Sequence, residues 1–208
     1  SIISGFFGKF IGDRNSEIVT SLLVSISAIF SCIVLYEVVQ NQYEDNIIIA
    51  TWINSGSLDV NWSMKIDPLS AVMLVVVTSV SALVHIYSIG YMSHDPHKPR
   101  FMAYLSLFTF AMLMLVTSDN FIQLFFGWEG VGLCSYFLIG FWFKKDTANA
   151  AAIKAFVVNR VGDFGFALGI FLIFYLFGTV NYSEVFEQIP TITNKNLNFL
   201  GIEINAID

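Results

Sequence analysis

Four ionisable residues stand inside two long apolar stretches in the second half of the chain. They are Glu129, Lys154, Arg160 and Asp163. Glu129 lies near the middle of residues 121–143, a run that is long enough to cross a bilayer. A charged side chain at that depth costs roughly 2.5–3.5 kcal/mol on insertion scales, so such residues usually mark ion or proton pathways. The sequence therefore predicts a functional carboxylate within a membrane.

The spacing of these residues suggests how a proton could be handled. Arg160 and Asp163 are three residues apart on an expected helix and can form an ion pair. Lys154 is nine residues before Asp163, which places it about half a turn away. In a medium of low dielectric, burial raises the pKa of a carboxylate and an approaching cation lowers it again. A cation that moves relative to Glu129 would therefore switch its proton affinity.

A purely structural interpretation of the same charges stays open. An ion-pair network can fix the register of two helices, and Lys154 can extend to the basic membrane interface. His85, with Tyr87 and Tyr91 on the same expected helix, can serve either as a proton relay or as a hydrogen-bonded packing residue.

Composition indicates a membrane protein. Apolar residues make up 56% of the 208 residues and charged residues 12%, which is too little charge for the surface of a soluble domain of this size. The chain has no basic patch for nucleic acid. No GxGxxG, P-loop or cysteine cluster is present, and Cys32 and Cys134 are too far apart for a metal motif. The sequence thus predicts no nucleotide, flavin, iron–sulfur or metal site.

Six apolar stretches predict an all-α polytopic membrane protein with about six transmembrane helices in one domain over residues 1–208. The stretches cover about residues 2–11, 18–39, 68–91, 101–117, 120–143 and 148–177. The first is too short to span a bilayer alone and is expected to be the end of a truncated helix. The sixth is long enough to need tilt, a kink near Gly162 or an interfacial first turn.

The segment between the second and third helices follows a different period. Residues 58–66 alternate between apolar and polar side chains and are separated by Asn54, Ser55, Gly56 and Ser57 from an apolar run at residues 47–53. This pattern predicts an amphipathic β-hairpin over about residues 47–66. The loops alternate between basic and acidic at each crossing, so the basic loops are expected to face the cytoplasm or matrix.

Two phrases carry a resemblance to a known family. They read GWEGVGLCSY at residues 127–136 and AIKAFVVNRVGD at 152–163, and shorter matches are DPLS at 67–70, HIYSIGYM at 85–92 and PRFM at 99–102. The chain resembles chain 5 of NADH–ubiquinone oxidoreductase (respiratory complex I) up to about Tyr182. The wording SHDPH at 93–97 is nearer to mitochondrial versions than to bacterial ones.

This resemblance implies a proton-translocating, antiporter-like subunit in the membrane arm of an NADH:ubiquinone reductase. It implies a multi-pass protein of the mitochondrial inner membrane, or alternatively of a bacterial plasma membrane. The family's fifth-helix acid maps onto Glu129, and its sixth-helix positions map onto Lys154, Arg160 and Asp163. No cofactor is expected in this chain, because FMN, the iron–sulfur clusters and ubiquinone belong to other subunits. The expected partners are lipids and other membrane-arm subunits, including a neighbouring antiporter-like subunit.

The chain also departs from this family in length. Family members continue through many more helices, including a broken helix whose lysine partners the fifth-helix acid. The sequence is therefore expected to be the N-terminal segment of a longer, processed or split subunit, with a second chain as one possible source of the rest. Two other functions stay open: the large subunit of a multi-subunit Na⁺/H⁺ antiporter, and a structural membrane scaffold.

Overall fold

The computed structural model describes residues 1–56, 58–192, 196–199 and 202–205. Its helices are α1 (Ile2–Ile11), α2 (Asp13–Asn41), α3 (Pro68–Tyr91), α4 (Lys98–Val116), α5 (Phe121–Ile139), α6 (Asp146–Phe177) and α7 (Tyr182–Ile192). Its strands are β1 (Asp45–Ser55), β2 (Leu58–Ile66), β3 (Asn196–Phe199) and β4 (Ile202–Asn205). The strands form two separate antiparallel hairpins, β1–β2 and β3–β4.

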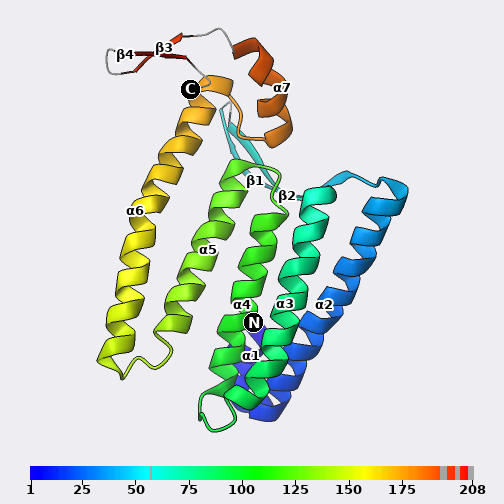
Figure 1. Ribbon diagram of the computed structural model, residues 1–208, viewed down its shortest axis with the longest axis vertical. Coiled ribbons are helices and arrows are strands. Elements are labelled where there is room, and N and C mark those ends of the chain that lie inside the picture. Colours follow the sequence, from blue (N-terminus) through cyan, green and yellow to red (C-terminus); the bar gives the residue numbers. More distant parts are fainter. Residues whose placement is uncertain (57, 193–195, 200–201, 206–208) are drawn as a thin grey trace.

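Five helices, α2 to α6, are long and apolar enough to cross a membrane. They run side by side in Figure 1, while α1 packs against α2 and α4 at one end of them. At 1.5 Å per residue the ten residues of α1 reach only about 15 Å, half of a bilayer core. The predicted fold, a polytopic helical protein with a short first helix and a hairpin between the second and third helices, is confirmed.

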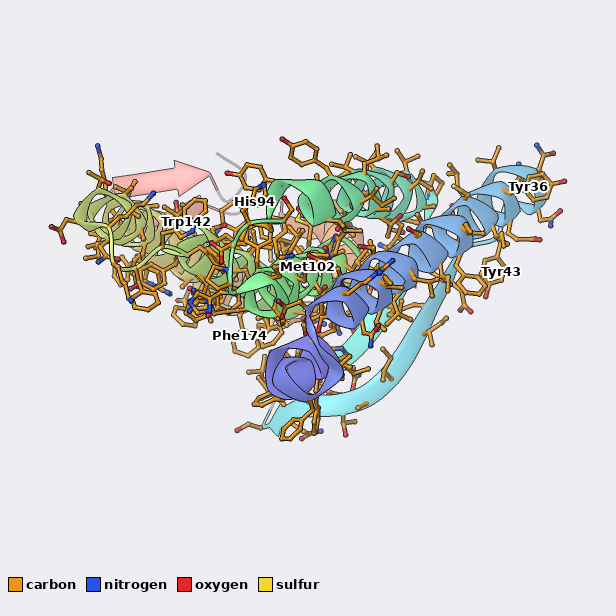
Figure 2. All side chains as sticks on the ribbon, turned by 90° about the horizontal axis from the view of Figure 1, so that it is seen from below. Tyr36, Tyr43, His94, Met102, Trp142 and Phe174 are labelled. Carbon is orange, nitrogen blue, oxygen red and sulfur yellow. The ribbon has the colours of Figure 1, made fainter. Side chains whose placement is uncertain are left out.

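The membrane helices form an extended row rather than a closed ring. Figure 2, viewed along the helices from the end that carries His94 and Trp142, shows α6 at one side of the row and α2 at the other. Each helix from α2 to α5 contacts the helix that follows it along the chain, and α2 also contacts α4. As a result α6 packs mainly on α5, and much of its surface is exposed in the described structure.

Charge separates along the axis of the row. The loops at the lower end of Figure 1 are the basic ones, with His94 and His97 between α3 and α4, and Lys144 and Lys145 between α5 and α6. The upper end carries β1, β2 and α7, whose charged residues are mostly acidic. We refer to these as the basic end and the acidic end. The orientation of the two ends in a membrane stays a prediction.

Side-chain caps set the start of two membrane helices. The Asp67 carboxylate accepts a hydrogen bond from the Ser70 backbone N–H at 2.7 Å, and the Asp67 N–H donates to the Ser70 hydroxyl at 2.8 Å. This capping box, followed by a proline at the first helical position, begins α3 as predicted. The Asn120 side chain caps α5 by accepting from the Gln123 N–H at 2.8 Å.

Three predicted helix boundaries are wrong. The second helix begins at Asp13 rather than near residue 18, and the fourth at Lys98 rather than near 101. Both helices start with a turn of mostly polar residues, and a search for apolar stretches does not include such a turn. The fifth ends at Ile139 rather than near 143, because the chain turns at Gly140. The sixth helix runs without interruption through Gly162.

The β1–β2 hairpin is held against the acidic end of α5. The buried Gln123 side chain bonds to both backbone groups of Ser63, accepting from its N–H at 3.0 Å and donating to its carbonyl at 2.7 Å. The side-chain amide of Asn120 donates to the Asn61 carbonyl at 3.0 Å. Two side chains near the start of α5 therefore replace the strand partner that the edge of β2 would otherwise lack.

Glycines bring α4 and α5 into close contact. A Cβ at Gly127 would lie 2.7 Å from the backbone N and Cα of Leu115, and one at Gly130 would lie 3.0 Å from the Ala111 Cβ. These two glycines therefore allow the close packing of α4 on α5. Gly165 and Gly169 differ, because no other part of the described chain lies within 4 Å of a Cβ built at either position.

Candidate functional site

An ion pair between α5 and α6 joins two of the predicted site residues. The Arg160 guanidinium donates a hydrogen bond from Nη1 to Oε1 of Glu129. Gly127 and Gly130, on either side of Glu129 in the sequence, let α5 pack closely on α4. This packing holds α5, and with it the Glu129 carboxylate, in position. The sequence alone offered Glu129 no local partner, and the structure supplies one from the neighbouring helix.

Asp163 is the most buried member of the cluster. Its side chain is 9% exposed, compared with 25% for Glu129 and 49% for Arg160. The indole N–H of Trp128 donates to Asp163 Oδ1 at 2.7 Å. Arg160 Nη1 lies 3.8 Å from Asp163 Oδ2, so the predicted pairing within α6 is present at the outer limit of an ion pair. The Trp128 donor satisfies a carboxylate that is otherwise remote from water.

One guanidinium thus serves two carboxylates. Arg160 bonds directly to Glu129 and lies farther from Asp163, and its guanidinium also lies 4.8 Å from the centre of the Phe156 ring. With both acids ionised the three residues carry a net charge of −1. If Arg160 moved fully to Asp163, Glu129 would lose the cation with which it is paired. The arrangement can therefore couple the position of one arginine to the protonation of an acid.

Lys154 stands apart from this cluster. It lies on α6, six residues closer to the basic end than Arg160, and its side chain is exposed. Within the described residues it forms no ion pair. The structure therefore brings together Glu129, Arg160 and Asp163 but leaves Lys154 outside, facing a surface that the described chain does not cover.

Trp128 is a site residue that sequence reasoning missed. The Trp128 indole reaches across to α6, and its ring packs edge-to-face on Phe166 with 6.3 Å between the ring centres. Its position directly before Glu129 was the available signal, because consecutive residues of a helix differ by only about 1.5 Å along its axis and so lie at nearly the same depth.

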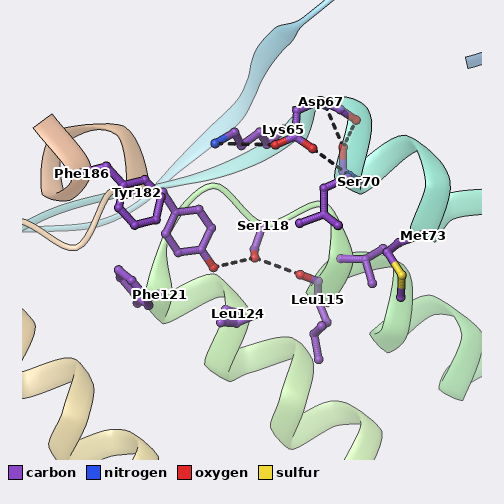
Figure 3. A pocket seen from close by; sticks show the side chains of 12 residues that line it. Lys65, Asp67, Ser70, Met73, Leu115, Ser118, Phe121, Leu124, Tyr182 and Phe186 are labelled. Atoms are coloured by element: carbon purple, nitrogen blue, oxygen red, sulfur yellow. Dashed lines mark hydrogen bonds and ion pairs between the residues drawn. The ribbon is translucent and has the colours of Figure 1, made fainter. Parts of the chain in front are cut away.

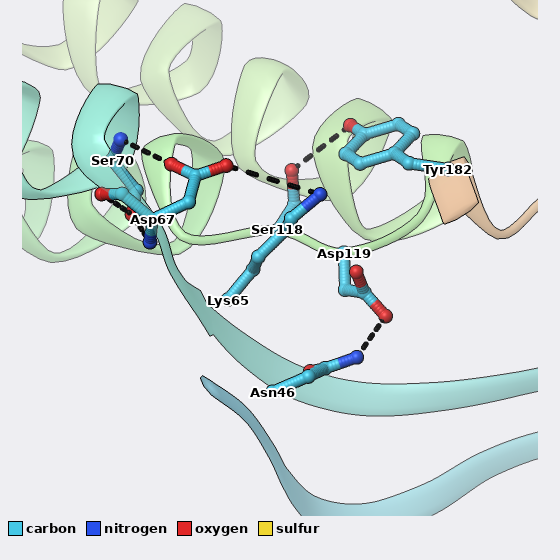
Figure 4. A network of polar contacts seen from close by, with 7 residues as sticks. All are labelled: Asn46, Lys65, Asp67, Ser70, Ser118, Asp119 and Tyr182. Atoms are coloured by element: carbon cyan, nitrogen blue, oxygen red, sulfur yellow. Dashed lines mark hydrogen bonds and ion pairs between the residues drawn. The ribbon is translucent and has the colours of Figure 1, made fainter. Parts of the chain in front are cut away.

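A second polar cluster lies at the acidic end, where the hairpin, α5 and α7 meet (Figures 3 and 4). Asn46 donates to the Asp119 carboxylate, and the Ser118 and Tyr182 hydroxyls lie 3.1 Å apart. Lys65 Nζ is 3.8 Å from Asp67. Burial raises the pKa of Asp119 above its ordinary value, although the Asn46 hydrogen bond opposes this. The cluster ties the hairpin and α7 to the helices.

A cavity of about 460 Å³ adjoins this cluster. It is lined mainly by apolar side chains from the ends of α3, α4 and α5, with Lys65 and Tyr182 at its rim (Figure 3). Among the residues that the structure describes, no group of three or more histidine, cysteine or acidic side chains is arranged to hold a metal ion.

Comparison with known proteins identifies the family. The family described as "NADH-Ubiquinone oxidoreductase (complex I), chain 5 N-terminus" matches residues 52–102, and "NADH:quinone oxidoreductase/Mrp antiporter, TM" matches residues 118–206. The NADH-ubiquinone oxidoreductase chain 5 of Marchantia polymorpha is 59% identical over 96% of this chain, and that of Triticum aestivum is 55% identical over 100%. The chain belongs to the chain 5 family of complex I.

Bacterial relatives agree with this assignment, and solved structures share the fold. The NADH-quinone oxidoreductase subunit L of Rhodobacter capsulatus is 52% identical over 99% of the chain. This chain spans only 30–31% of the length of these chain 5 and subunit L relatives. Two structures share its fold over 88% of the chain: an Mrp complex from Dietzia (TM-score 0.72, 22% identity, 19% of that chain) and an archaeal membrane-bound sulfane sulfur reductase (TM-score 0.75, 19% identity, 37% of that chain).

Proposed function

We propose that this chain is part of a membrane-arm subunit that translocates protons in an NADH:ubiquinone oxidoreductase. The observation that carries the proposal is the Glu129–Arg160–Asp163 cluster, in which one cation lies between two acids at membrane depth. Such a cluster is costly to bury in hydrocarbon and is expected where charge moves. In this proposal residues 1–208 are the N-terminal transmembrane segment of a longer subunit, since the chain spans only about 31% of the length of its chain 5 relatives.

In this proposal Glu129 is the acid that gains and loses the proton. Arg160 is paired with Glu129 in the structure and would free this carboxylate to take up a proton by moving toward Asp163. Asp163 is held in position by Trp128 to receive the guanidinium. Lys154, exposed on α6, would act on Glu129 or on a neighbouring helix only after a further segment covers that face.

The redox chemistry would take place in other subunits. This chain would hold no redox centre, and FMN, the iron–sulfur clusters and ubiquinone would be bound elsewhere in the complex. Its partners would be the surrounding lipids and the other membrane-arm subunits, including the neighbouring antiporter-like subunit. A second chain that carries the rest of this subunit would be a further partner. The eukaryotic relatives favour the mitochondrial inner membrane as its location, with a bacterial plasma membrane as the alternative.

An Mrp-type Na⁺/H⁺ antiporter subunit is the second candidate function. The shared family over residues 118–206 and the Mrp structure favour it to the extent that the fold is common to both. Identities of 47–59% with chain 5 and subunit L proteins, against 22% with the Mrp structure, favour complex I. A structural scaffold is the third, and it makes the opposite prediction for Glu129.

Proton translocation by the assembled complex tests the proposal. Glu129→Gln keeps the size and polarity of the side chain but removes its charge, so NADH-driven acidification should be abolished or severely reduced. Glu187→Gln is the matched control, because the same change is made on an exposed acid of α7 outside the membrane helices. Full translocation by Glu129→Gln in an assembled complex would support the scaffold instead.

A further inference from the structure

A buried histidine lies between α3 and α4, away from the acid cluster. The His85 side chain is completely inaccessible, and it stands six residues before the basic end of α3, about 9 Å at 1.5 Å per residue. Its Nδ1 is 2.8 Å from the Ser81 carbonyl oxygen, and its Nε2 is 3.1 Å from the Ser106 hydroxyl of α4. Both ring nitrogens are therefore engaged.

The partners determine where the ring carries hydrogen. A carbonyl oxygen can only accept, so Nδ1 must carry the N–H that donates to Ser81. In the neutral ring Nε2 then has a free lone pair, which requires Ser106 to donate. The Ser106 hydroxyl also lies 2.8 Å from the Met102 carbonyl oxygen, and its single hydrogen can serve only one of these acceptors.

This geometry accommodates both charge states of His85. In the neutral state the Ser106 hydroxyl points to Nε2. In the charged state the hydroxyl rotates to the Met102 carbonyl and accepts a hydrogen bond from the new Nε2–H. In each state both ring nitrogens of His85 and the Ser106 hydroxyl have a partner, and only hydrogen atoms have to move. A histidine with a purely packing role needs only the neutral arrangement.

Unpaired polar atoms mark a hydrated route from the basic end toward this histidine. Among the side chains that the structure describes, three buried oxygens on α2 have no hydrogen-bond partner: Ser16 Oγ, Glu17 Oε1 and Ser21 Oγ. Glu17 is 6% exposed, and Lys98 Nζ lies 4.0 Å from the same Oε1. Buried polar atoms are nearly always satisfied, and where protein groups do not reach them water does. We expect ordered water at these three atoms.

Hydroxyl groups continue from Glu17 to His85. Thr20 lies one turn above Ser16 and donates to the Ser16 carbonyl at 2.7 Å, which leaves its oxygen free to accept. Thr20 and Ser106 line the same cavity between α1, α2 and α4, of about 190 Å³, which has room for several waters. Water in this cavity would link the Glu17 region to the hydroxyl that contacts Nε2.

We propose that His85 and Ser106 form a proton-uptake site that water connects to the basic end through Glu17 and Thr20. A hydronium ion in the cavity gives a proton to Ser106 Oγ while Ser106 passes its own proton to Nε2. One hydronium O–H bond and one serine O–H bond break, a new serine O–H and an Nε2–H bond form, and water remains. The positive charge moves from the cavity to the imidazolium.

The ionisable groups facing this route are few within the described residues. They are Glu17 of α2 and Lys98 at the start of α4. Glu17 attracts a hydronium ion to the mouth of the route, and Lys98 Nζ lies 4.0 Å from its Oε1. This site goes beyond the proposed function, because it uses helices that do not carry Glu129.

Infrared difference spectroscopy of the full subunit in its membrane complex tests protonation directly. With ¹⁵N-labelled histidine, acidifying the basic side should produce an imidazolium band that is absent in His85→Gln. Ser106→Ala should shift or remove this band because the imidazolium loses its acceptor. Ser88→Ala is the matched control: Ser88 is also buried in α3, but its hydroxyl donates only within its own helix, to Val84 at 2.7 Å.

Cysteine labelling from the basic side tests the water route. Thr20→Cys should react with a water-soluble thiosulfonate at least about tenfold faster than the native buried Cys134, because the thiolate forms only where water reaches it. Equal labelling rates, or the same histidine band in wild type and His85→Gln, would overturn the proposal. Both readouts are independent of pumping, so they separate this site from a failure of the role given to Glu129.

Discussion

The contact between α4 and α5 allows a prediction whose size can be worked from the structure. In Gly127→Ala the new Cβ would lie 2.7 Å from three atoms of Leu115, its N, Cα and Cβ. Ordinary contact begins at 3.4 Å, so the helices must separate by about 0.7 Å (3.4 − 2.7) at this point. The shift would also displace Glu129, which is two residues farther along α5.

The expected cost is the balance of two terms. Overpacking of a tight contact typically costs about 1–3 kcal/mol. Replacing glycine by alanine inside a helix returns roughly 0.5–1 kcal/mol. We therefore expect Gly127→Ala to lower the free energy of unfolding by about 1–2 kcal/mol. Gly132→Ala lies on the same helix, and no part of the described chain comes within 4 Å of its Cβ position, so this change should instead be neutral or stabilising by about 0.5–1 kcal/mol.

Equilibrium unfolding of the purified chain in mixed lipid–detergent micelles, titrated with SDS, measures both values. A second variant, Leu115→Ala, sharpens the test because alanine keeps the N, Cα and Cβ atoms that cause the clash. Combining it with Gly127→Ala should therefore give no rescue. Equal stability of the two glycine variants, or recovery in the double variant, would refute the reasoning.

Three further predictions concern side-chain hydrogen bonds. Trp128→Phe removes the hydrogen bond to the Asp163 carboxylate and should lower the free energy of unfolding by the roughly 1.5–3 kcal/mol that a bond to a charged group contributes. A double-mutant cycle with Asp163→Asn that shows no coupling in SDS unfolding would contradict this. Gln123→Leu leaves both backbone groups of Ser63 unpaired, so amide hydrogen exchange across the hairpin should accelerate while exchange in α6 stays unchanged. Burial raises the pKa of Asp119 above 3.8, so the folded state binds a proton at this carboxylate more tightly than the unfolded state does. The free energy of unfolding should therefore fall as the pH rises above 3.8. Asp119→Asn should remove this fall in pH-dependent unfolding, and an unchanged pH dependence would exclude the effect.

Features set by local sequence could be predicted. The alternation of residues 58–66 predicted β2, and the third and fifth apolar stretches predicted the starts of α3 and α5 near residues 68 and 120, where Asp67 and Asn120 cap the helices. The pairing of Arg160 with Asp163 followed from their spacing on one helix. In each case the partners are close along the chain, so the helical or strand period alone fixes their relative positions.

Features that depend on how two helices meet could not be predicted. The bonds from Arg160 to Glu129 and from Trp128 to Asp163 need a particular rotation and height of α6 against α5. No local pattern sets these, because both helices are apolar on most faces. The start of α2 at Asp13 was missed for a different reason: its first turn is polar, and hydrophobicity marks only the part of a helix within the apolar layer.

The central claim is that Glu129 changes its protonation during turnover. The most direct measurement is the infrared difference spectrum of the assembled complex when NADH drives it, recorded in the carboxylic-acid C=O region. We expect a C=O band of protonated Glu129 that appears and decays with turnover. This band should be missing in Glu129→Gln and kept in Glu187→Gln. A spectrum that is the same in all three proteins would show that Glu129 stays charged throughout, and would contradict the account.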